Sequence, residues 1–451
     1  MILSGLTITN NDLRTEHAQL MDEGRDLSPT IEAEFRELSS VNMEIDPSYQ
    51  TRAQALLDMA EGLPFRLDYP YQEPTDLEGI RAARPQGQRT FDQPLNEKDL
   101  SDRLLGAWLG RCSGCLLGKP VEGWRSGIMW PYLKDLGHYP LQDYFRSDVP
   151  EEIIEKYHLS RQGAYIDRVP HMVEDDDTNY TMTGLAIMDH YGPNFTPEDV
   201  ANFWLGNIPI FHTFTAERVA YRNLTNLVPP PESAGFRNPY REWIGAQIRA
   251  DFWGYVAAGN PEKAAEFAWR DASISHVRNG IYGEMWVAAM LASAPFISEA
   301  REVIIAGLSE IPQESRLAEA IHEVMAWFDE GIDFEEAIQR IHAKWDETWG
   351  HHWCHTLSNA QIVAMGLLWG ENDFEKSICR AVQACFDTDC NGATVGSVFG
   401  MMHGAKALPE KWIGPLNDGL ETGIPGYNFV KISEMAQKTA KLRKPITGTG
   451  L

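Results

Sequence analysis

The sequence predicts an all-α protein, a large multi-helix bundle that carries an N-terminal extension. From Asp99 onward, apolar residues recur every three or four positions in ten stretches, the spacing of one helix face. Runs that alternate apolar and polar residues, as half-buried strands do, are few. The chain has 451 residues, 43% of them hydrophobic, so it is long enough to bury a large core.

Residues 1–98 differ from the rest of the chain. They contain one polar stretch of helical character, about residues 28–61, followed by a segment rich in proline, glycine and aromatic residues. We therefore expect an N-terminal extension over residues 1–98 and a helical domain over residues 99–451. The sequence leaves open whether the extension covers a pocket, packs along the bundle or forms a partner surface.

The helices of the domain are predicted in order from the apolar spacing. Expected ranges are 102–118, 178–190, 241–257, 261–273, 281–294, 315–329, 333–345, 357–369, 373–385 and 391–404. Because few other segments show a regular period, connecting loops are expected between them.

Composition narrows the classes of partner and compartment. The net charge is −26, which repels nucleic acid and anionic membranes, so neither is expected as a partner. No apolar run approaches the ~20 residues of a membrane span, and no signal peptide is evident. Six cysteines are too sparse for a disulfide framework. A soluble, cytoplasmic protein is expected. The sequence does not indicate its oligomeric state.

Two of the expected helices carry a glycine at every fourth position. These are Gly106, Gly110, Gly114 and Gly118 in the first, and Gly392, Gly396, Gly400 and Gly404 in the second. Each interior glycine costs a helix about 1 kcal/mol relative to alanine, so a compensating gain is needed. A ridge of glycines lets another helix backbone come unusually close. We expect both helices in the core, packed on each other.

Acidic residues gather just before two expected helices. Residues 174–177 read Glu-Asp-Asp-Asp, and Asp387 and Asp389 stand about 210 residues later. Helix capping explains one or two such acids. Adjacent carboxylates repel one another unless solvent or a cation separates them, so the alternative is a site for Mg²⁺, Mn²⁺ or Ca²⁺. On spacing alone, both interpretations stay open.

Two further motifs are weaker. Cys112 and Cys115 form a C-x-x-C pair inside an expected helix with no second pair, which disfavours zinc or redox chemistry. The stretch HHWCH, residues 351–355, is compatible with a soft-metal site, but a pocket-lining loop before a helix is favoured.

The chain from about Asp102 to Trp412 resembles the ADP-ribosylglycohydrolase family, whose members include the glycohydrolase that reactivates ADP-ribosylated dinitrogenase reductase. Four blocks carry the likeness, in the order of the family. They read GAWLGRCSGCLLGKPVEGW, EDDDTNYTMTGLAI, IGAQIRADFWGY with SISHVRNGIYGEMWVAAMLA, and AVQACFDTDCNGATVGSVFGMMHGAKALPEKW. The resemblance implies a large orthogonal multi-helix bundle with one or two Mg²⁺ ions, or Mn²⁺, that cleaves a glycosidic bond at the anomeric carbon of ribose.

Carried over by position, the resemblance also implies the metal ligands. They are Asp175, Asp176, Asp177, Asp387, Asp389 and Cys390. Asp175 and Cys390 stand where the family usually has a threonine. The first change adds a carboxylate, and the second replaces a hard oxygen with a sulfur that Mg²⁺ binds poorly. The number of metal ions, one or two, depends on these two positions.

Catalytic and substrate-binding residues are implied in the same way. Glu122 is expected to be the general base or acid, with Asp176 as the second candidate, although on sequence alone Glu122 also fits an ordinary surface loop. His276, Asn279, Gly280 and Tyr282 align with the nucleotide- or ribose-binding part of the family, and Arg249 is a candidate phosphate contact. The alternatives are a helix-start loop with a buried tyrosine, and a buried ion pair for Arg249.

The resulting prediction is a metal-dependent glycosidase. Its expected substrate is a ribosylated small molecule or an ADP-ribosylated protein. The alternative is a catalytically inactive module that binds ADP-ribose or a nucleotide on the same fold.

Overall fold

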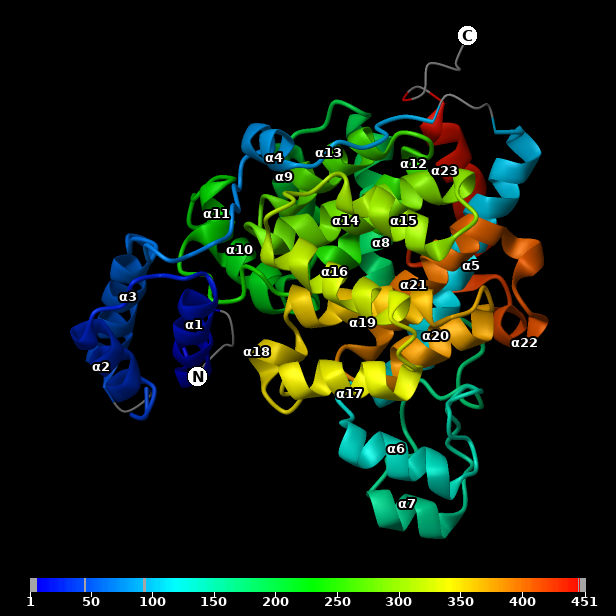
Figure 1. The fold of residues 1–451 in the computed structure, drawn as a ribbon, viewed down its shortest axis with the longest axis horizontal. Coiled ribbons are helices and arrows are strands. Elements are labelled where there is room, and N and C mark those ends of the chain that lie inside the picture. The colour runs from blue at the N-terminus through cyan, green and yellow to red at the C-terminus, as the bar shows by residue number, and fades with distance from the viewer. Residues whose placement is uncertain (1–5, 44–45, 92–94, 445, 447–451) are drawn as a thin grey trace.

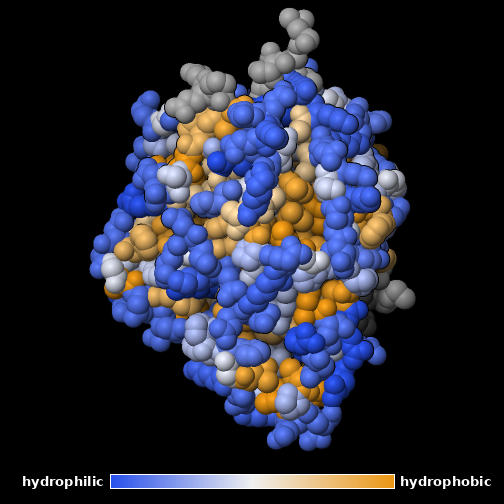
Figure 2. All heavy atoms as spheres, turned by 90° about the vertical axis from the view of Figure 1, so that its right-hand side faces the viewer, coloured by the Kyte–Doolittle hydropathy of each residue, from blue (hydrophilic) through white to orange (hydrophobic). Residues whose placement is uncertain are grey.

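The computed structural model describes residues 6–43, 46–91, 95–444 and 446. These residues form α-helices, short 3-10 turns and one two-stranded sheet, which confirms the all-α prediction. In Figure 1 the first three helices lie to the left of the main helical body, and α6 and α7 project below it. When the right-hand side of Figure 1 is turned to face the viewer, the surface is largely hydrophilic with apolar patches between (Figure 2). No described helix is long and apolar enough to cross a bilayer.

The elements have the following bounds. The extension contains α1 (Asn10–Asp22), α2 (Pro29–Leu38), α3 (Pro47–Glu61) and α4 (Leu77–Ala83). The main body contains α5 (Glu97–Gly118), α6 (Ser126–Asp135), α7 (Glu151–Tyr157), α8 (Asp176–Tyr191), α9 (Pro197–Asn207), α10 (Thr215–Thr225), α11 (Glu232–Gly235), α12 (Asp251–Val256), α13 (Pro261–Ala272), α14 (Asn279–Ser293), α15 (Ala300–Leu308), α16 (Arg316–Asp329), α17 (Phe334–Lys344), α18 (Gly350–Trp353), α19 (Thr356–Leu368), α20 (Phe374–Gln383), α21 (Thr388–His403), α22 (Glu410–Ile413) and α23 (Ile432–Arg443). The antiparallel pair is β1 (Gly419–Glu421) and β2 (Phe429–Lys431).

Nine of the ten helices expected in the domain are present, with ends shifted by at most five residues. The helix expected at 241–257 is the exception, because only α12 and a 3-10 turn at 247–249 form there. Residues 241–246 before them form turns around one antiparallel β-bridge between Trp243 and His355. Ile244 N donates to Cys354 O at 2.8 Å, and Thr356 N donates to Glu242 O at 3.1 Å. The stretch expected at 28–61 is two helices, since Ser39 ends α2 and Pro47 begins α3.

The two glycine-rich helices, α5 and α21, pack against each other in antiparallel directions, as expected. A Cβ atom on Gly110 would overlap the carbonyl oxygen of Gly396, and one on Gly114 would overlap that of Gly392. At the end of this contact, Thr388 Oγ1 donates to Gly118 O at 2.9 Å. The glycine contact therefore brings the C-terminal end of α5 to the N-terminal end of α21.

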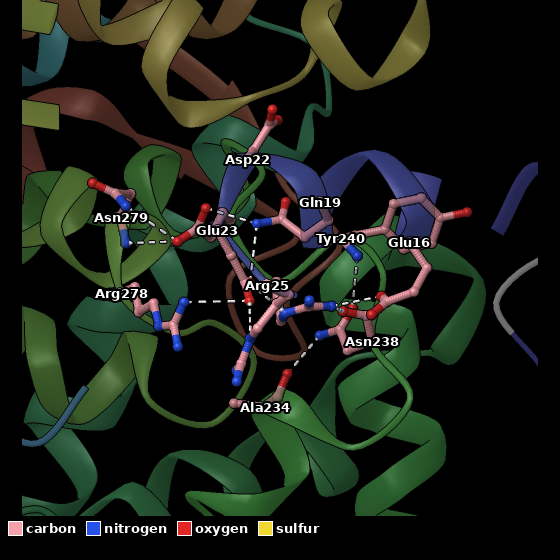
Figure 3. Close-up of polar contacts among 12 residues, drawn as sticks. Glu16, Gln19, Asp22, Glu23, Arg25, Ala234, Asn238, Tyr240, Arg278 and Asn279 are labelled. Carbon is pink, nitrogen blue, oxygen red and sulfur yellow. Dashed lines mark hydrogen bonds and ion pairs between the residues drawn. The ribbon is translucent and has the colours of Figure 1, made fainter. Parts of the chain in front are cut away.

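The extension packs along the bundle, and α1 is joined to it by polar groups on one helix face. Arg241 donates to Glu16 at 2.6 Å and to Glu23 at 2.7 Å, and Gln19 donates to Glu242 at 2.7 Å. Figure 3 labels Glu16, Gln19 and Glu23 among these polar contacts. The buried parts of α1, α2 and α3 also form a small apolar core of their own. The extension thus has its own core but depends on the main body to pair its buried charges.

Candidate metal centre and active site

An acidic cavity of about 410 Å³ lies where α8 and α21 begin. The N-cap residues of these helices are Asp175 and Asp387, so each acidic block predicted from the sequence opens a helix at the same cavity. Its lining is Lys119, Glu122, Glu174, Asp175, Asp176, Asn179, Phe211, His212, Phe214, Trp353, Cys354, Asp387, Asp389 and Cys390. Six of these residues are carboxylic acids.

Residues from distant segments of the chain meet in this cavity. Carboxylate oxygens of Glu122, Asp387 and Asp389 lie within 4.8 Å of one another. Ligand atoms of Asp177, Asp389 and Cys390 form a second such group. Glu122 follows the 3-10 turn Lys119–Val121 that continues from α5, so its position is a consequence of the glycine contact between α5 and α21.

Asp175 has two structural partners. Its Oδ1 accepts a hydrogen bond from the backbone N of Asp177 at 2.9 Å, which is the N-cap of α8. Its Oδ2 lies 2.6 Å from Lys119 Nζ. Burial disfavours ionisation of Asp175, but the lysine and the cap outweigh it, and the pKa of this carboxyl is lowered. Sequence reasoning gave no role to Lys119.

Glu122, Asp176 and Asp389 have no such ion pair, and their pKa values are raised. Burial, and then the charges of Asp387 and Asp175, raise the pKa of Glu122 to about 7. Burial and neighbouring carboxylates likewise raise the pKa of Asp176 and of Asp389 well above the usual range. The cluster therefore carries more negative charge than its own cations balance.

Asp177 lies beneath the cavity floor. Arg111 Nη2 donates to its Oδ1 at 3.1 Å and to its backbone oxygen at 2.8 Å, while Nη1 donates to Asp251 at 2.7 Å. All three side chains are buried. In the sequence, this contact is indicated by the presence of Arg111 within a glycine-rich helix that is expected in the core.

An aromatic rim borders the acidic floor. Phe211 and Phe214 are 57% and 51% exposed, an unusual fraction for large apolar side chains on either side of a cavity mouth. Between them, His212 Nδ1 lies 2.9 Å from Glu174 Oε1. Trp353 also lines the cavity. No periodic pattern marks these residues, so sequence reasoning missed Phe211, His212 and Phe214.

The HHWCH stretch divides between two sides of the protein. Trp353 and Cys354 line the cavity, as a pocket-lining loop would. His351 Nε2 instead lies 2.8 Å from Asp22 Oδ2 of the extension, and His355 caps α19 by accepting from Leu357 N at 3.1 Å. Trp353 and Cys354 thus match the pocket-lining interpretation, while ligand atoms of Asp22, His351 and His355 lie within 4.8 Å of one another, close enough to share a metal ion.

The residues aligned with substrate binding lie elsewhere. His276, Asn279, Gly280 and Tyr282 are buried, and none of them lines the cavity. The extension covers this region: Asn279 Nδ2 donates to Glu73 at 2.8 Å, and the Tyr282 hydroxyl donates to Pro74 O. The structure therefore gives these residues contacts within the protein.

Arg249 is also buried away from the cavity lining. It donates to Asp271 at 2.5 Å and to Glu217 at 2.9 Å. This arrangement matches the alternative of a buried ion pair.

The donor set fits a hard divalent cation. Asp177 Oδ2 and Asp389 Oδ1 are buried and lack a hydrogen-bond partner, and such orphaned carboxylate oxygens are costly without a cation. Cys390 offers a sulfur, a poor ligand for Mg²⁺. All six cysteines are free and buried, so Cys112 and Cys115 form no disulfide.

Fold and cavity together define an all-α protein with an acidic centre built on two helix N-termini. The model of the ADP-ribosylglycohydrolase family matches residues 96–445, so the chain belongs to this family. Among curated proteins nothing matches. A solved structure described as "ADP-ribosylglycohydrolase-related protein complex" is 20% identical and covers 77% of this chain and 99% of that chain. Its TM-score of 0.45 is too low to support an argument.

Proposed function

We propose that the acidic cavity binds Mg²⁺ or Mn²⁺ and hydrolyses the glycosidic bond at the anomeric carbon of a ribosylated substrate. Family membership supports a glycohydrolase. The observation that carries the finer proposal is the convergence of six carboxylic acids, with only Lys119 and His212 as basic residues, in one cavity. A binding module has little use for so many uncompensated acids.

The cation would be held by Asp176, Asp387 and Asp389, with Asp177 below them. When bound, it would supply Lewis-acid stabilisation and lower the pKa of a water molecule. The positive charge of Lys119 balances the negative charge of Asp175. Asp175 is thus the acid of the cavity least available to a second ion, which favours a single cation.

Glu122 is the proposed general base or acid. It is exposed to the cavity, and its pKa of about 7 lets it both hold and release a proton near neutral pH. Asp176 is the second candidate. Phe211 and Phe214 provide ring faces on which the base or another planar part of the substrate can stack. The substrate is a ribosylated small molecule or an ADP-ribosylated protein.

A second candidate function is binding of ADP-ribose or a nucleotide without cleavage. It is favoured by Cys390 at a position where the family usually has a threonine ligand, and by the Lys119–Asp175 pair, since both weaken metal binding.

Isothermal titration with Mg²⁺ and Mn²⁺ tests the metal site. We expect binding to the wild-type protein and none to Asp176→Asn or Asp387→Asn, while Asp148→Asn, at an exposed acid paired with Arg146, binds normally. A panel of ADP-ribosylated and N-ribosylated compounds should then release a ribose-containing product, and Glu122→Gln should slow release at least 100-fold. Absence of metal binding to the wild-type protein would overturn the hydrolase; metal binding without product would favour the binding module.

A further inference from the structure

A second cavity lies at the junction of the extension and the main body. It measures about 460 Å³ and is bordered by α1, α2 and Trp349, the residue before α18. We call it the junction groove and define it by Arg14, His17, Phe35, Arg36 and Trp349. Cavities of about 300 to 1,000 Å³ are the usual size for small-molecule ligands.

The groove has an unusual charge. The chain has 65 acids and 39 lysines and arginines, and most arginines of the structure pair with a carboxylate. Arg14 and Arg36 line the groove, yet among the described residues neither has a carboxylate within ion-pairing distance. Arg14 has one long hydrogen bond, from Nη1 to Ser39 O at 3.5 Å. Glu32 also lines the groove but forms an ion pair with neither arginine. Two exposed arginines beside this one acid, in a protein this acidic, favour an anionic ligand.

Aromatic groups stand beside these arginines. Trp349 is 36% exposed although it is a large apolar side chain. Phe35 is buried and contacts the His17 ring edge-on, with the ring centres 5.6 Å apart. An exposed indole beside arginine side chains is a surface on which a planar ring stacks.

We propose that the junction groove binds a nucleoside phosphate, with the base stacked on Trp349 and the phosphate held by Arg14 and Arg36. Guanidinium groups match phosphate oxygens in geometry and charge, and Trp349 matches the planar base. The proposal is independent of any chemistry in the acidic cavity. The two sites are nevertheless connected by the short helix α18. Trp349 of the junction groove precedes α18, and Trp353, the last residue of α18, lines the acidic cavity.

Isothermal titration of the full chain in EDTA tests the proposal, because chelation keeps divalent cations out of the acidic cavity. The probes are AMP, adenosine and inorganic phosphate. Binding of AMP is expected to be at least tenfold tighter than binding of either part alone. Arg14→Gln and Arg36→Gln should each weaken AMP at least fivefold and leave adenosine unchanged, whereas Trp349→Ala should weaken both AMP and adenosine.

Matched controls separate this site from others. Arg340→Gln, at an exposed arginine of α17 paired with Glu336, should bind AMP like the wild-type protein. Asp387→Asn, in the acidic cavity, should also leave AMP binding unchanged. The proposal is overturned if AMP binds no tighter than adenosine, if Arg14→Gln and Arg36→Gln keep wild-type affinity, or if Asp387→Asn abolishes binding. None of these results bears on metal binding, so the two proposals fail separately.

Discussion

The Lys119 ammonium lies 2.6 Å from the Asp175 carboxylate inside a cavity of six acids. Asp175 is buried and stands where the family usually has a neutral threonine, so its charge is additional to the usual set. Lys119 is the cavity residue that offsets it. The extra acid and the lysine are therefore best understood together, as one ion pair beside the five other acids of the cavity.

Replacing Lys119 should show how much the buried charge of Asp175 destabilises the folded protein when it has no counter-charge. Lys119→Met leaves Asp175 buried without a counter-charge, and breaking a buried ion pair in this way costs about 3 to 5 kcal/mol. We therefore expect the melting temperature of the metal-free variant to fall, and Mg²⁺ to raise it by a larger amount than in the wild-type protein. Thermal melts with EDTA or with Mg²⁺ measure both effects.

The matched control for this experiment is Lys156→Met. Lys156 also pairs with an aspartate, Asp135, at 2.5 Å, but on the exposed surface, where such a pair contributes only about 0 to 1 kcal/mol. Equal losses in Lys119→Met and Lys156→Met would show that the cavity pair has no special energetic role.

The pKa of Glu122 makes a prediction about pH. An acid whose pKa rises on folding, here from 4.5 to about 7, binds more protons folded than unfolded. Its cost to stability is full above pH 7 and shrinks as pH falls toward 4.5. Glu122→Gln should therefore stabilise the metal-free protein more at pH 8 than at pH 6, by on the order of 1 to 3 °C in melting temperature.

All other titratable groups are the same in the two proteins, so their contributions cancel in the comparison. Melts of both proteins in EDTA at pH 6, 7 and 8 give the difference directly. A difference that stays constant with pH, or grows toward pH 6, would contradict the raised pKa.

The close approach of α5 and α21 predicts an unusual response to alanine. Gly114→Ala improves helix propensity by about 1 kcal/mol, yet its Cβ would overlap the Gly392 carbonyl oxygen. We expect a net loss of several kcal/mol and weaker metal binding, because the two helices must separate and carry Glu122 away from Asp389. Gly127→Ala is the control, since a Cβ there meets nothing within 4 Å and should be neutral or stabilising.

Denaturant unfolding measures both glycine variants, and Mg²⁺ titration measures the second effect. Gly114→Ala with wild-type stability would show that the backbones can part without cost. Loss of stability with unchanged metal affinity would instead separate the helix contact from the site.

The main helices and the acidic cavity were predictable because their signals are local. A glycine at every fourth position predicts that the backbone of another helix comes close, and the acidic residues before α8 and α21 are predicted to lie at the N-termini of these helices. The likeness to the family then orders the blocks along the chain. Glu122, Asp387 and Asp389 meet as a result of these local features and of the one contact between α5 and α21.

The rest depended on contacts between distant segments. Asn279 and Tyr282 are covered by Glu73 and Pro74 of the extension, and no pattern near residue 280 indicates that cover. The aromatic rim at 211–214 and the lysine at 119 likewise have no periodic signal. A helix was expected at 241–257 because the apolar spacing fits, but residues 241–246 form turns whose backbone pairs with residues 354–356.

The junction between α1 and the main body yields the last prediction. Arg241 pairs with Glu16 and Glu23, all three being buried. Arg241→Met leaves Glu16 without a counter-charge and leaves Glu23 with only Arg25 and Arg278, so it should cost about 3 to 5 kcal/mol. Arg237→Met is the control at the same junction, because Arg237 pairs with the half-exposed Asp58 and should lose about 0 to 1 kcal/mol. Denaturant unfolding compares them. A loss of stability in Arg241→Met no larger than that of the control would contradict the prediction. We also expect a chain lacking residues 1–61 to be destabilised, because Arg241 would lose both of its partners; a truncated chain with unchanged stability would show that α1 only rests on the bundle.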